Sequence, residues 1–353
     1  MKKVLITGVT GQDGSLMADF LLQNTQNTIV AGVRRLSVKN HENIKHIINH
    51  PRFKLIDLDI TDNENVSKVI SEEKPDYFIN FAANSFVGNS WTMPINHMQT
   101  NAMSVLYQLN AILKYCPDCK YYNAGSSEEF GDVDYCPQNE MHPLKPRSPY
   151  GASKASARHL VKVYRESFNI FAIQGWLFNH EGVRRGEDFV TRKISKGVAE
   201  ISHSILNNRP FKPLSLGNIE SKRDWSDAED FVKGVWLMLE QETPKEYVLS
   251  SGECHSIREF VDHCLNFANL QGYWCGKGVD EKFILDNHLI EEHSLKNHVI
   301  VDISEDFYRP AEVDILLGDP SNAEKKLGWK RKTNFKKLVQ KMYEHDFNLL
   351  CNK

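Results

Sequence analysis

Short apolar runs alternate with longer stretches of helical periodicity along the first half of the chain. The apolar runs lie at residues 4–7, 28–33, 53–58, 77–80, 120–123 and 170–176. Their length and their aliphatic and aromatic side chains are typical of buried parallel strands. Helices are predicted between them, through residues 16–21 and at about 62–73, 94–115 and 149–168. This alternation predicts an α/β fold with a Rossmann-type doubly wound parallel sheet.

The pattern changes after about residue 180. Helices are predicted at about 189–206 and 228–240, whereas residues 272–296 are polar and predict an irregular, exposed excursion. We therefore expect a cofactor-binding domain at 1–180 and a smaller, mainly substrate-binding lobe at 181–353, with the chain crossing between the lobes. A length of 353 residues is sufficient for both.

A glycine-rich turn follows the first predicted strand, with Gly8, Gly11 and Gly14 at GxxGxxG spacing. Gly8 would allow a tight turn, Gly11 would let the backbone approach a pyrophosphate, and Gly14 would let helix and strand pack closely. Free N–H groups at the start of the helix would bind the phosphates. Strand, glycine turn and helix together predict a dinucleotide-binding site.

Two arginines, Arg34 and Arg35, follow the second predicted strand. An acidic residue at this place would accept from the ribose 2′-hydroxyl of NAD. Guanidinium groups instead suit a 2′-phosphate, which they can bind through paired hydrogen bonds. The sequence therefore predicts NADP as the cofactor.

One stretch after the fifth predicted strand gathers most of the groups that could do chemistry. Ser126 and Glu128 lie in a small-residue turn, and a helix follows in which Tyr150 and Lys154 are one turn apart on one face. An ammonium beside a phenol favours the phenolate, so we expect a lowered pKa for Tyr150. A tyrosine and a lysine at this spacing are more often a solvated pair, so the assignment depends on the glycine turn.

Several polar or small residues are predicted at the carboxyl ends of the strands, where ligands of such sheets bind. Asp59 and Ile60 would lie beside the adenine. The small residues after the fourth strand would let the chain pass close to the cofactor. Segments 8–14, 82–85 and 126–128 are all expected at one crevice.

The bulk composition excludes several classes of function. There are 43 Lys and Arg against 46 Asp and Glu, a net charge of −3 without a basic block, so nucleic acid and anionic membrane are not expected as partners. No apolar run approaches the roughly 20 residues of a membrane span. Seven cysteines without a secretion signal favour reduced thiols in a cytoplasm. Cys116 and Cys119 form a CxxC without a second pair, so no metal site is predicted.

Six stretches together resemble the GDP-mannose 4,6-dehydratase family of extended short-chain dehydrogenase/reductases. They are TGVTGQDGS, the arginine pair, SPYGASK, LFNHEGVRRGEDFVTRKI, SLGNIESKRDW and YRPAEVD. The resemblance implies that Ser126, Glu128, Tyr150 and Lys154 are catalytic. The full set of expected cofactor-binding residues is Gly8, Thr10, Gly11, Gln12, Asp13, Gly14, Arg34, Arg35, Asp59, Ile60, Phe81, Ala82, Ala83, Ser85, Tyr150, Lys154, His180 and Arg185. The expected substrate-binding residues are Ser85, Phe86, Ser126, Glu128, Asn179, Val190, Lys193, Leu216, Asn218, Arg223, Arg309 and Glu312.

The resemblance also implies a reaction. Tyr150 would take the proton of the sugar 4-hydroxyl while C4 gives hydride to NADP⁺, with Ser126 hydrogen-bonded at O4 and Lys154 at the nicotinamide ribose. Glu128 would remove the C5 proton and protonate the departing C6 hydroxyl. Hydride return to C6 would leave the cofactor as it began. The product would be a GDP-4-keto-6-deoxy sugar.

Departures from the family's usual residues cluster around the expected sugar pocket, at Phe86, Gly88, Asn89, Gly125 and Ser126. Several are smaller than the usual side chain. We therefore expect either GDP-D-mannose or its C6-extended homologue GDP-D-glycero-D-manno-heptose as substrate, and the sequence leaves the two open.

Two rival functions share much of the pattern. An NADP-dependent nucleotide-sugar epimerase or reductase would use the glycine turn and the Tyr–Lys pair, but it has no need for a carboxylate at Glu128. A non-catalytic NADP sensor could lose Tyr150 or Lys154 without penalty, and this chain retains both. By resemblance, the loop at 36–50 is expected at a subunit interface, which implies a homo-oligomer, either a dimer or a tetramer.

Overall fold

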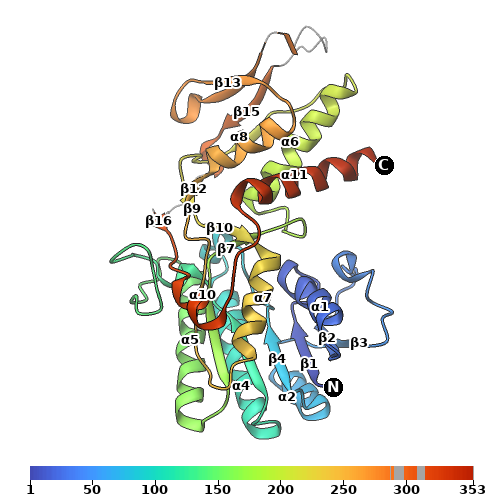
Figure 1. Ribbon diagram of the computed structural model, residues 1–353, viewed down its shortest axis with the longest axis vertical. Coiled ribbons are helices and arrows are strands. Elements are labelled where there is room, and N and C mark those ends of the chain that lie inside the picture. The colour runs from blue at the N-terminus through green and yellow to red at the C-terminus, as the bar shows by residue number, and fades with distance from the viewer. Residues whose placement is uncertain (287, 290–297, 308–314, 353) are drawn as a thin grey trace.

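The computed structural model of the protein describes residues 1–286, 288–289, 298–307 and 315–352, which form two stacked lobes (Figure 1). The lower lobe contains a large sheet with helices on both faces, and the upper lobe contains a smaller sheet packed against helices. None of the helices in these parts of the chain is long and apolar enough to span a bilayer.

The large sheet has seven strands in the order β11-β6-β5-β4-β1-β2-β3, and every pairing is parallel. Its strands are β1 (Lys3–Thr7), β2 (Thr28–Val33), β3 (Phe53–Asp57), β4 (Tyr77–Asn80), β5 (Lys120–Ala124), β6 (Ala172–Leu177) and β11 (Val248–Leu249). The strand order reverses between β1 and β4, which opens a crevice at the carboxyl ends of the strands. The predicted doubly wound sheet is confirmed, and six of its strands are those predicted from the apolar runs.

Helices cover the two faces of this sheet in separate layers. One face packs on α1 (Gln12–Asn24), α7 (Ala228–Leu239) and α10 (Ser321–Leu327). The other packs on α2 (Asn63–Glu73), α4 (Ser104–Tyr115) and α5 (Pro149–Phe168). Alternate residues of each strand enter the two cores: Val4 and Ile6 face the first and Leu5 the second. The long α5 starts with Pro149, and its N-cap Ser148 accepts from the N–H of Gly151.

The helix predicted at 94–115 is interrupted. It consists of α3 (Pro94–Met98), a π-helical turn η3 (Gln99–Met103), and α4. The turn carries Asn101, whose side chain accepts from the N–H of Asn84 at 2.8 Å and donates to its carbonyl at 3.0 Å. A regular helix would not present this amide in the same way, so the interruption anchors the loop after β4.

The upper lobe is built on a four-stranded sheet in the order β13-β14-β15-β8. Its strands are β13 (Gly272–Cys275), β14 (Lys282–Leu285), β15 (Val299–Ile303) and β8 (Leu214–Leu216). The helices α6 (Val190–Leu206), α8 (Ile257–Phe267) and α11 (Phe335–Cys351) form the remainder of its core. The helices predicted at 189–206 and 228–240 correspond to α6 and α7.

The prediction that residues 272–296 are irregular is wrong for the hairpin β13–β14. Phe283 and Leu285 are buried in the core of the lobe, and the Trp274 ring packs edge-on against Phe283 with centroids 5.4 Å apart. Each strand has only four residues, so the alternation of apolar and polar side chains is too short to identify a strand from the sequence. Residues 287 and 290–296 of this stretch lie outside the described part of the chain.

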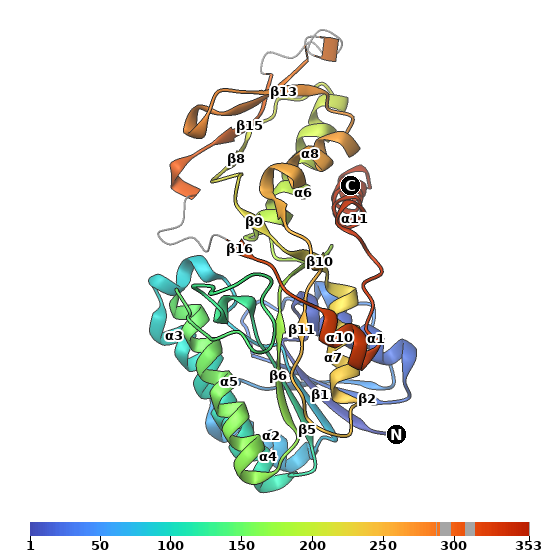
Figure 2. The same cartoon turned by 60° about the vertical axis from the view of Figure 1, so that its left-hand side comes forward.

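Short strands connect the lobes (Figure 2). They are β7 (Asn179–Glu181) with β10 (Trp225–Asp227), and β9 (Lys222–Arg223) between β12 (His255–Ser256) and β16 (Ile315–Leu316). Single turns complete the structure: η1 (Glu42–Ile44), η2 (Val87–Trp91), η4 (Ser127–Glu129), η5 (Gly278–Asp280) and η6 (Glu305–Phe307). The chain returns from the upper lobe to the large sheet through α7, β11 and α10, so each lobe contains segments from distant parts of the sequence.

Candidate active site

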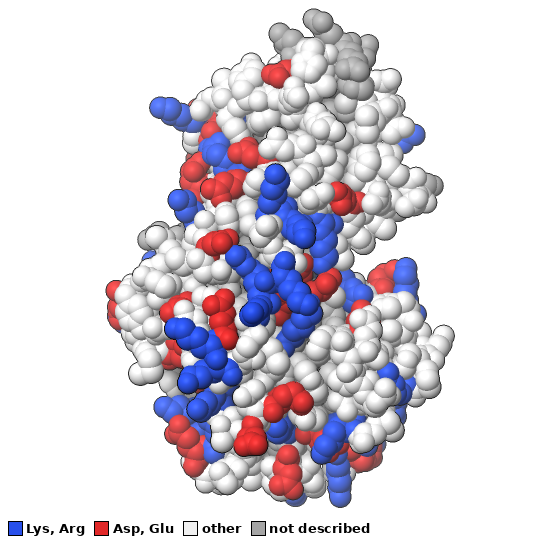
Figure 3. Space-filling model, in the orientation of Figure 1, with Lys and Arg blue, Asp and Glu red and all other residues white. Residues whose placement is uncertain are grey.

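A cleft of about 1720 Å³ runs between the lobes, above the carboxyl ends of the large sheet. Lys and Arg side chains gather on the surface at the level where the two lobes meet (Figure 3). Such a concentration of positive charge suits an anionic ligand, because the walls of a cleft focus the field.

The cleft brings together all of the predicted site residues that lie in the described part of the chain. The lining includes Gly8, Thr10, Gly11, Gln12, Asp13, Gly14, Arg34, Arg35, Asp59, Ile60, Phe81, Ala82, Ala83, Ser85, Phe86, Ser126, Glu128, Tyr150, Lys154, Asn179, His180, Arg185, Val190, Lys193, Leu216, Asn218 and Arg223. Arg309 and Glu312, which were also predicted, fall outside the described residues.

The glycine turn has the geometry of a phosphate cradle. Gly8 has a φ of +71°, and a Cβ there would lie 2.7 Å from the backbone nitrogen of Ala82. A Cβ on Gly14 would lie 2.4 Å from the Gly8 carbonyl oxygen, and the N–H of Gly11 donates to that same oxygen at 3.0 Å. Because α1 begins at Gln12, which lines the cleft, its first N–H groups have no intrahelical partner and are available to a phosphate. The turn therefore fits a dinucleotide.

Ser126 and Glu128 are presented by the single turn η4 at the end of β5. The Ser126 hydroxyl accepts from the N–H of Glu128 at 3.2 Å, and the N–H of Ser126 donates to Oε1 of Glu129 at 2.8 Å. Glu128 lines the cleft, whereas Glu129 is fully buried and forms an ion pair with Arg158. The two adjacent glutamates therefore point to opposite sides of the turn.

Tyr150 and Lys154 lie on the first turns of α5, facing the cleft. Nζ of Lys154 is 6.0 Å from the centre of the Tyr150 ring and donates to the carbonyl of Ala124 at 2.7 Å. Burial raises the pKa of Tyr150 to about 12, opposed by a hydrogen bond with Ser126. Burial also lowers the pKa of Lys154 to about 8.

The prediction that Lys154 lowers the pKa of Tyr150 is thus wrong, because the protein groups around the phenol raise its pKa. Burial has the largest effect on the phenol, and the charge of Glu128 adds to it. The lysine ammonium is directed to a backbone carbonyl instead. Spacing in the sequence places the two side chains on one face, but it does not report how far each is removed from water.

Aromatic rings line the upper part of the cleft. Phe86, from the loop after β4, meets Phe189 edge-on with ring centroids 6.0 Å apart. The guanidinium of Arg185 lies 3.6 Å above the Phe189 ring, and Nζ of Lys193 lies 3.3 Å above the ring of Phe307. Phe189 and Phe307 were not predicted as site residues, although each stands within or beside a basic turn motif.

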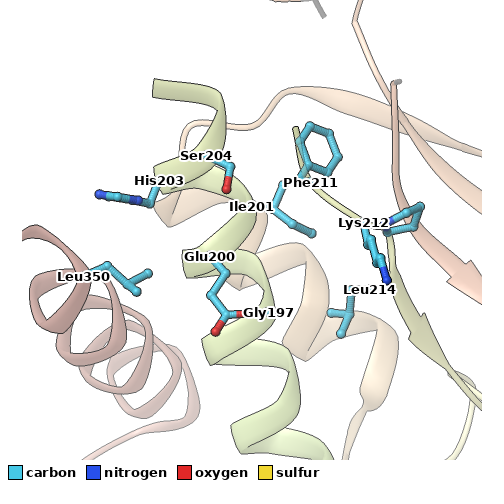
Figure 4. Close-up of a pocket in the computed structure, with 10 residues that line it drawn as sticks. Gly197, Glu200, Ile201, His203, Ser204, Phe211, Lys212, Leu214 and Leu350 are labelled. Carbon is cyan, nitrogen blue, oxygen red and sulfur yellow. The ribbon is translucent and has the colours of Figure 1, made fainter. Parts of the chain in front are cut away.

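A second pocket of about 460 Å³ lies on the upper lobe between α6, residues 211–214 and α11 (Figure 4). Its rim carries Glu200 on α6 and Lys212 on the facing segment, and it contains none of the predicted site residues. Within the described residues there is no group of three side chains suited to a metal ion, and Cys116 and Cys119 carry free thiols.

The chain matches the family model described as GDP-mannose 4,6 dehydratase over residues 5–342. It is 40% identical to a GDP-mannose 4,6 dehydratase of Drosophila melanogaster, covering 99% of this chain and 87% of that protein. It is 39% identical to a GDP-mannose 4,6-dehydratase of Vibrio cholerae, covering 98% and 93%, and 40% identical to one of Homo sapiens, covering 98% and 91%.

Solved structures share the fold at lower identity. UDP-glucuronic acid 4-epimerase from Bacillus cereus, in complex with UDP-glucuronic acid and NAD, superposes with a TM-score of 0.78 at 21% identity, covering 98% of this chain and 99% of that one. RMD from Pseudomonas aeruginosa, complexed with NADPH, gives 0.74 at 19%, covering 99% and 100%. At these identities the likeness establishes the fold alone.

Proposed function

The chain belongs to the GDP-mannose 4,6-dehydratase family, and on this premise we propose that it removes water from a GDP-bound sugar of manno configuration. The product is the GDP-4-keto-6-deoxy sugar. The observation that carries the proposal is the position of Glu128, which enters the same cleft as Tyr150 and Ser126 and whose charge acts on the phenol. Elimination of water needs a carboxylate at this place.

Each catalytic side chain has a defined task. Tyr150 is placed to accept the proton of the sugar 4-hydroxyl, and Ser126, which is hydrogen-bonded to that phenol, is placed to donate to O4. Glu128 removes the C5 proton once C4 is a ketone and returns a proton to the C6 hydroxyl as it leaves. Lys154, which lines the same cleft, would hold the nicotinamide ribose of a bound cofactor.

A bound nicotinamide would supply reversible hydride transfer, taking hydride from C4 and delivering it to C6. The residues that would hold its dinucleotide are the glycine turn and the first turn of α1. Because the hydride is returned to the product, the reaction needs no outside oxidant or reductant.

We assign NADP rather than NAD to this site. Arg34 and Arg35 directly follow β2 and line the cleft, and Lys39 joins them there. The side chain of Asp59 is occupied within its own turn, where it accepts from the N–H and the hydroxyl of Thr61 at 2.9 and 2.7 Å. The cationic end of β2 therefore favours a ligand with an additional phosphate.

The sugar is either mannose or the manno-heptose, and the residues at Phe86 and Gly88 favour a pocket that admits the longer sugar. A Cβ on Gly88 would lie 3.1 Å from the ring of Phe86, so the absence of a side chain at Gly88 lets the Phe86 ring occupy its present position. Phe86 is 38% exposed and lines the cleft, where a C6 extension would need space.

The rival functions differ in their products. A nucleotide-sugar epimerase or reductase on this fold would leave the mass of the sugar unchanged or raise it by two hydrogens. A non-catalytic NADP-binding protein would leave the substrate intact. The presence of Glu128 beside the Tyr–Lys pair favours dehydration over both.

We also propose a homo-oligomer, dimer or tetramer, located in the cytoplasm. The loop after the arginine pair exposes the apolar residues Leu36 and Val38, with exposed fractions of 48% and 83%. All seven cysteines carry free thiols, which suits a reducing compartment. Light scattering at micromolar concentration tests the assembly, and a monomer would contradict it.

Incubation of the purified protein with GDP-mannose or GDP-manno-heptose, without added cofactor, tests the reaction. We expect the sugar nucleotide to lose the mass of one water with no net reduction of bound NADP. Equal efficiency on both sugars would contradict the pocket interpretation. Intact substrate, or substrate altered without loss of water, would contradict the dehydratase assignment.

A further inference from the structure

Four buried polar side chains form a line across neighbouring strands of the large sheet. Thr7, Asn80, Asn123 and Gln174 lie on β1, β4, β5 and β6, and the strand registers pair each with the next. The Thr7 hydroxyl donates to Oδ1 of Asn80, Nδ2 of Asn80 donates to Oδ1 of Asn123 at 2.7 Å, and Nδ2 of Asn123 donates to Oε1 of Gln174 at 2.7 Å. All four are between 0 and 2% exposed. We call these residues the amide line.

The amide line ends on both catalytic segments. Nε2 of Gln174 donates to Oε1 of Glu129 at 3.0 Å and to the carbonyl of Lys154 at 2.9 Å. The same Oε1 of Glu129 accepts the N–H of Ser126 at 2.8 Å. One amide group on β6, a strand that carries none of the catalytic side chains, therefore joins the turn of Ser126 to the helix of Lys154.

The carboxylate of Glu129 fixes the orientation of every amide in the line. Its oxygens are paired with Arg158 and accept the N–H of Ser126, so the NH₂ group of Gln174 must face it. The oxygen of Gln174 then faces Asn123 and must accept from its NH₂ group. The oxygen of Asn123 in turn accepts from the NH₂ group of Asn80, and the oxygen of Asn80 accepts from the hydroxyl of Thr7. A buried line with a single orientation is rigid, because reversing one amide would leave donors opposed to donors.

We propose that Gln174 and Glu129 are positioning residues for the dehydration: they hold the Ser126–Glu128 turn and the Tyr150–Lys154 helix in the mutual placement that the reaction needs. This inference rests on the proposed function. Neither side chain lines the cleft, so each acts through the residues it holds. A displacement of about 1 Å between reacting groups can cost about 100-fold in rate.

The test uses Gln174→Met, which keeps the volume and removes the hydrogen bonds. Gln108→Met is the matched control, because Gln108 is also 0% exposed and packs on the same side of the sheet. Its side chain accepts from the hydroxyl of Tyr121 at 2.8 Å, and Tyr121 lies on β5 two residues before Asn123. We expect Gln174→Met to lower kcat at least 30-fold with KM within about 3-fold, since substrate contacts are retained. Gln108→Met should keep kcat within about 3-fold.

Hydrogen exchange gives a measurement that needs no catalysis. In Gln174→Met, amides in residues 125–130 and 149–157 should exchange faster than in the wild type, and in Gln108→Met they should not. If Gln174→Met does not fold, Gln174→Asn replaces it, since the amide is one methylene too short to reach both partners.

The outcomes separate the two proposals. A wild type that fails to release water from the substrate contradicts the proposed function. In that case hydrogen exchange in the Gln174 variant still shows whether Gln174 holds the Ser126–Glu128 turn and the Tyr150–Lys154 helix in place. An active wild type with unchanged kcat and unchanged exchange in the Gln174 variant overturns the positioning role. An equal loss of kcat in both glutamine variants also overturns it, because a general effect of burial would then suffice.

Discussion

Nε2 of His180 lies 2.9 Å from Oδ2 of Asp13, which ties the short strand β7 to the first turn of α1. Burial acts to raise the pKa of Asp13, but the charge and hydrogen bond of His180, the charge of Arg185 and a hydrogen bond from Gln12 together outweigh it, so the net pKa is lowered. Burial acts to lower the pKa of His180, but the Asp13 charge and hydrogen bond raise it overall. The first turn of α1 is therefore tied by an ion pair to β7, the strand that leads towards the upper lobe.

This pair predicts a pH window for stability. The contribution of His180 is complete below the ordinary histidine pKa and is lost as the pH rises through the raised folded value. The contribution of Asp13 is present above the ordinary aspartate pKa and is lost as the pH falls through the lowered folded value. His180→Gln should lower the free energy of unfolding near neutral pH by about 1.5–3 kcal/mol and remove the alkaline decline, measured by urea unfolding from pH 5 to 9.

The surface pair of His46 and Asp19, at 2.7 Å, supplies the control. The side chain of His46 is 46% exposed, so His46→Gln should change stability by about 1 kcal/mol or less. If both variants lost the same unfolding free energy, the larger effect expected of the buried His180–Asp13 pair would be contradicted.

The adjacent glutamates should differ in how much each contributes to stability. Glu128→Gln should keep the melting temperature close to wild type and lower kcat for water loss by about 10²–10⁴-fold. Glu129→Gln breaks a buried ion pair by removing one partner and should cost about 3–5 kcal/mol in unfolding free energy. Thermal unfolding and product mass, measured on both variants, test the contrast. An unstable Glu128→Gln would contradict it.

Lys154 should oppose folding while serving catalysis. Its folded pKa of about 8 lies below the ordinary 10.5, so the unfolded chain holds the proton more tightly. The opposition is complete below pH 8 and fades as the pH rises towards 10.5. Lys154→Met should therefore stabilise the protein at pH 7, by at most about 3 kcal/mol, and inactivate it. Urea unfolding at pH 7 and pH 10 tests this, since the gain should shrink at the higher pH.

The arginine pair should determine cofactor choice. Arg34→Ala and Arg35→Ala should each weaken NADP binding by about 10–100-fold, the equivalent of losing charged hydrogen bonds to a phosphate. NAD binding should change little, because NAD has no 2′-phosphate. Isothermal titration with both cofactors measures the difference, and Arg331→Ala, outside the cleft, is the control. A parallel loss for NAD would contradict the assignment.

Gly88→Ala should alter sugar choice without affecting the chemistry. The new Cβ would meet the Phe86 ring at 3.1 Å and push it towards the cleft. We expect kcat/KM for the manno-heptose to fall by about 10-fold relative to GDP-mannose, the effect of about one methylene of lost space. Competition between the two sugars, followed by mass, measures the ratio. An unchanged ratio would place the C6 extension elsewhere.

The sequence predicted the elements whose signals are local. The glycine turn and six strands of the large sheet were recognisable because chirality and periodicity act within a few residues. The two-residue strand β11 and the hairpin β13–β14 are too short for periodicity. The amide line was missed because Asn80, Asn123 and Gln174 are some 40–50 positions apart in sequence and, taken singly, are polar residues in apolar runs. Only strand register brings them together.

The lowered Tyr150 pKa was mispredicted for a related reason. An i, i+4 spacing specifies which face of a helix two side chains share, but desolvation depends on everything packed around them. The buried role of Glu129 was hidden in the same way, because its partner Arg158 belongs to another element.

The return of the chain to the large sheet affects how the protein is made. Phe231 on α7 belongs to the core beneath the sheet, and the ring of Trp329 packs on it edge-on at 5.9 Å while its Nε1 donates to the Asp230 carbonyl at 2.8 Å. During synthesis, six strands leave the ribosome long before these rings do. Until then that face of the nascent sheet lacks the cover of α7 and α10, and the lower lobe is completed after most of the upper lobe has been translated.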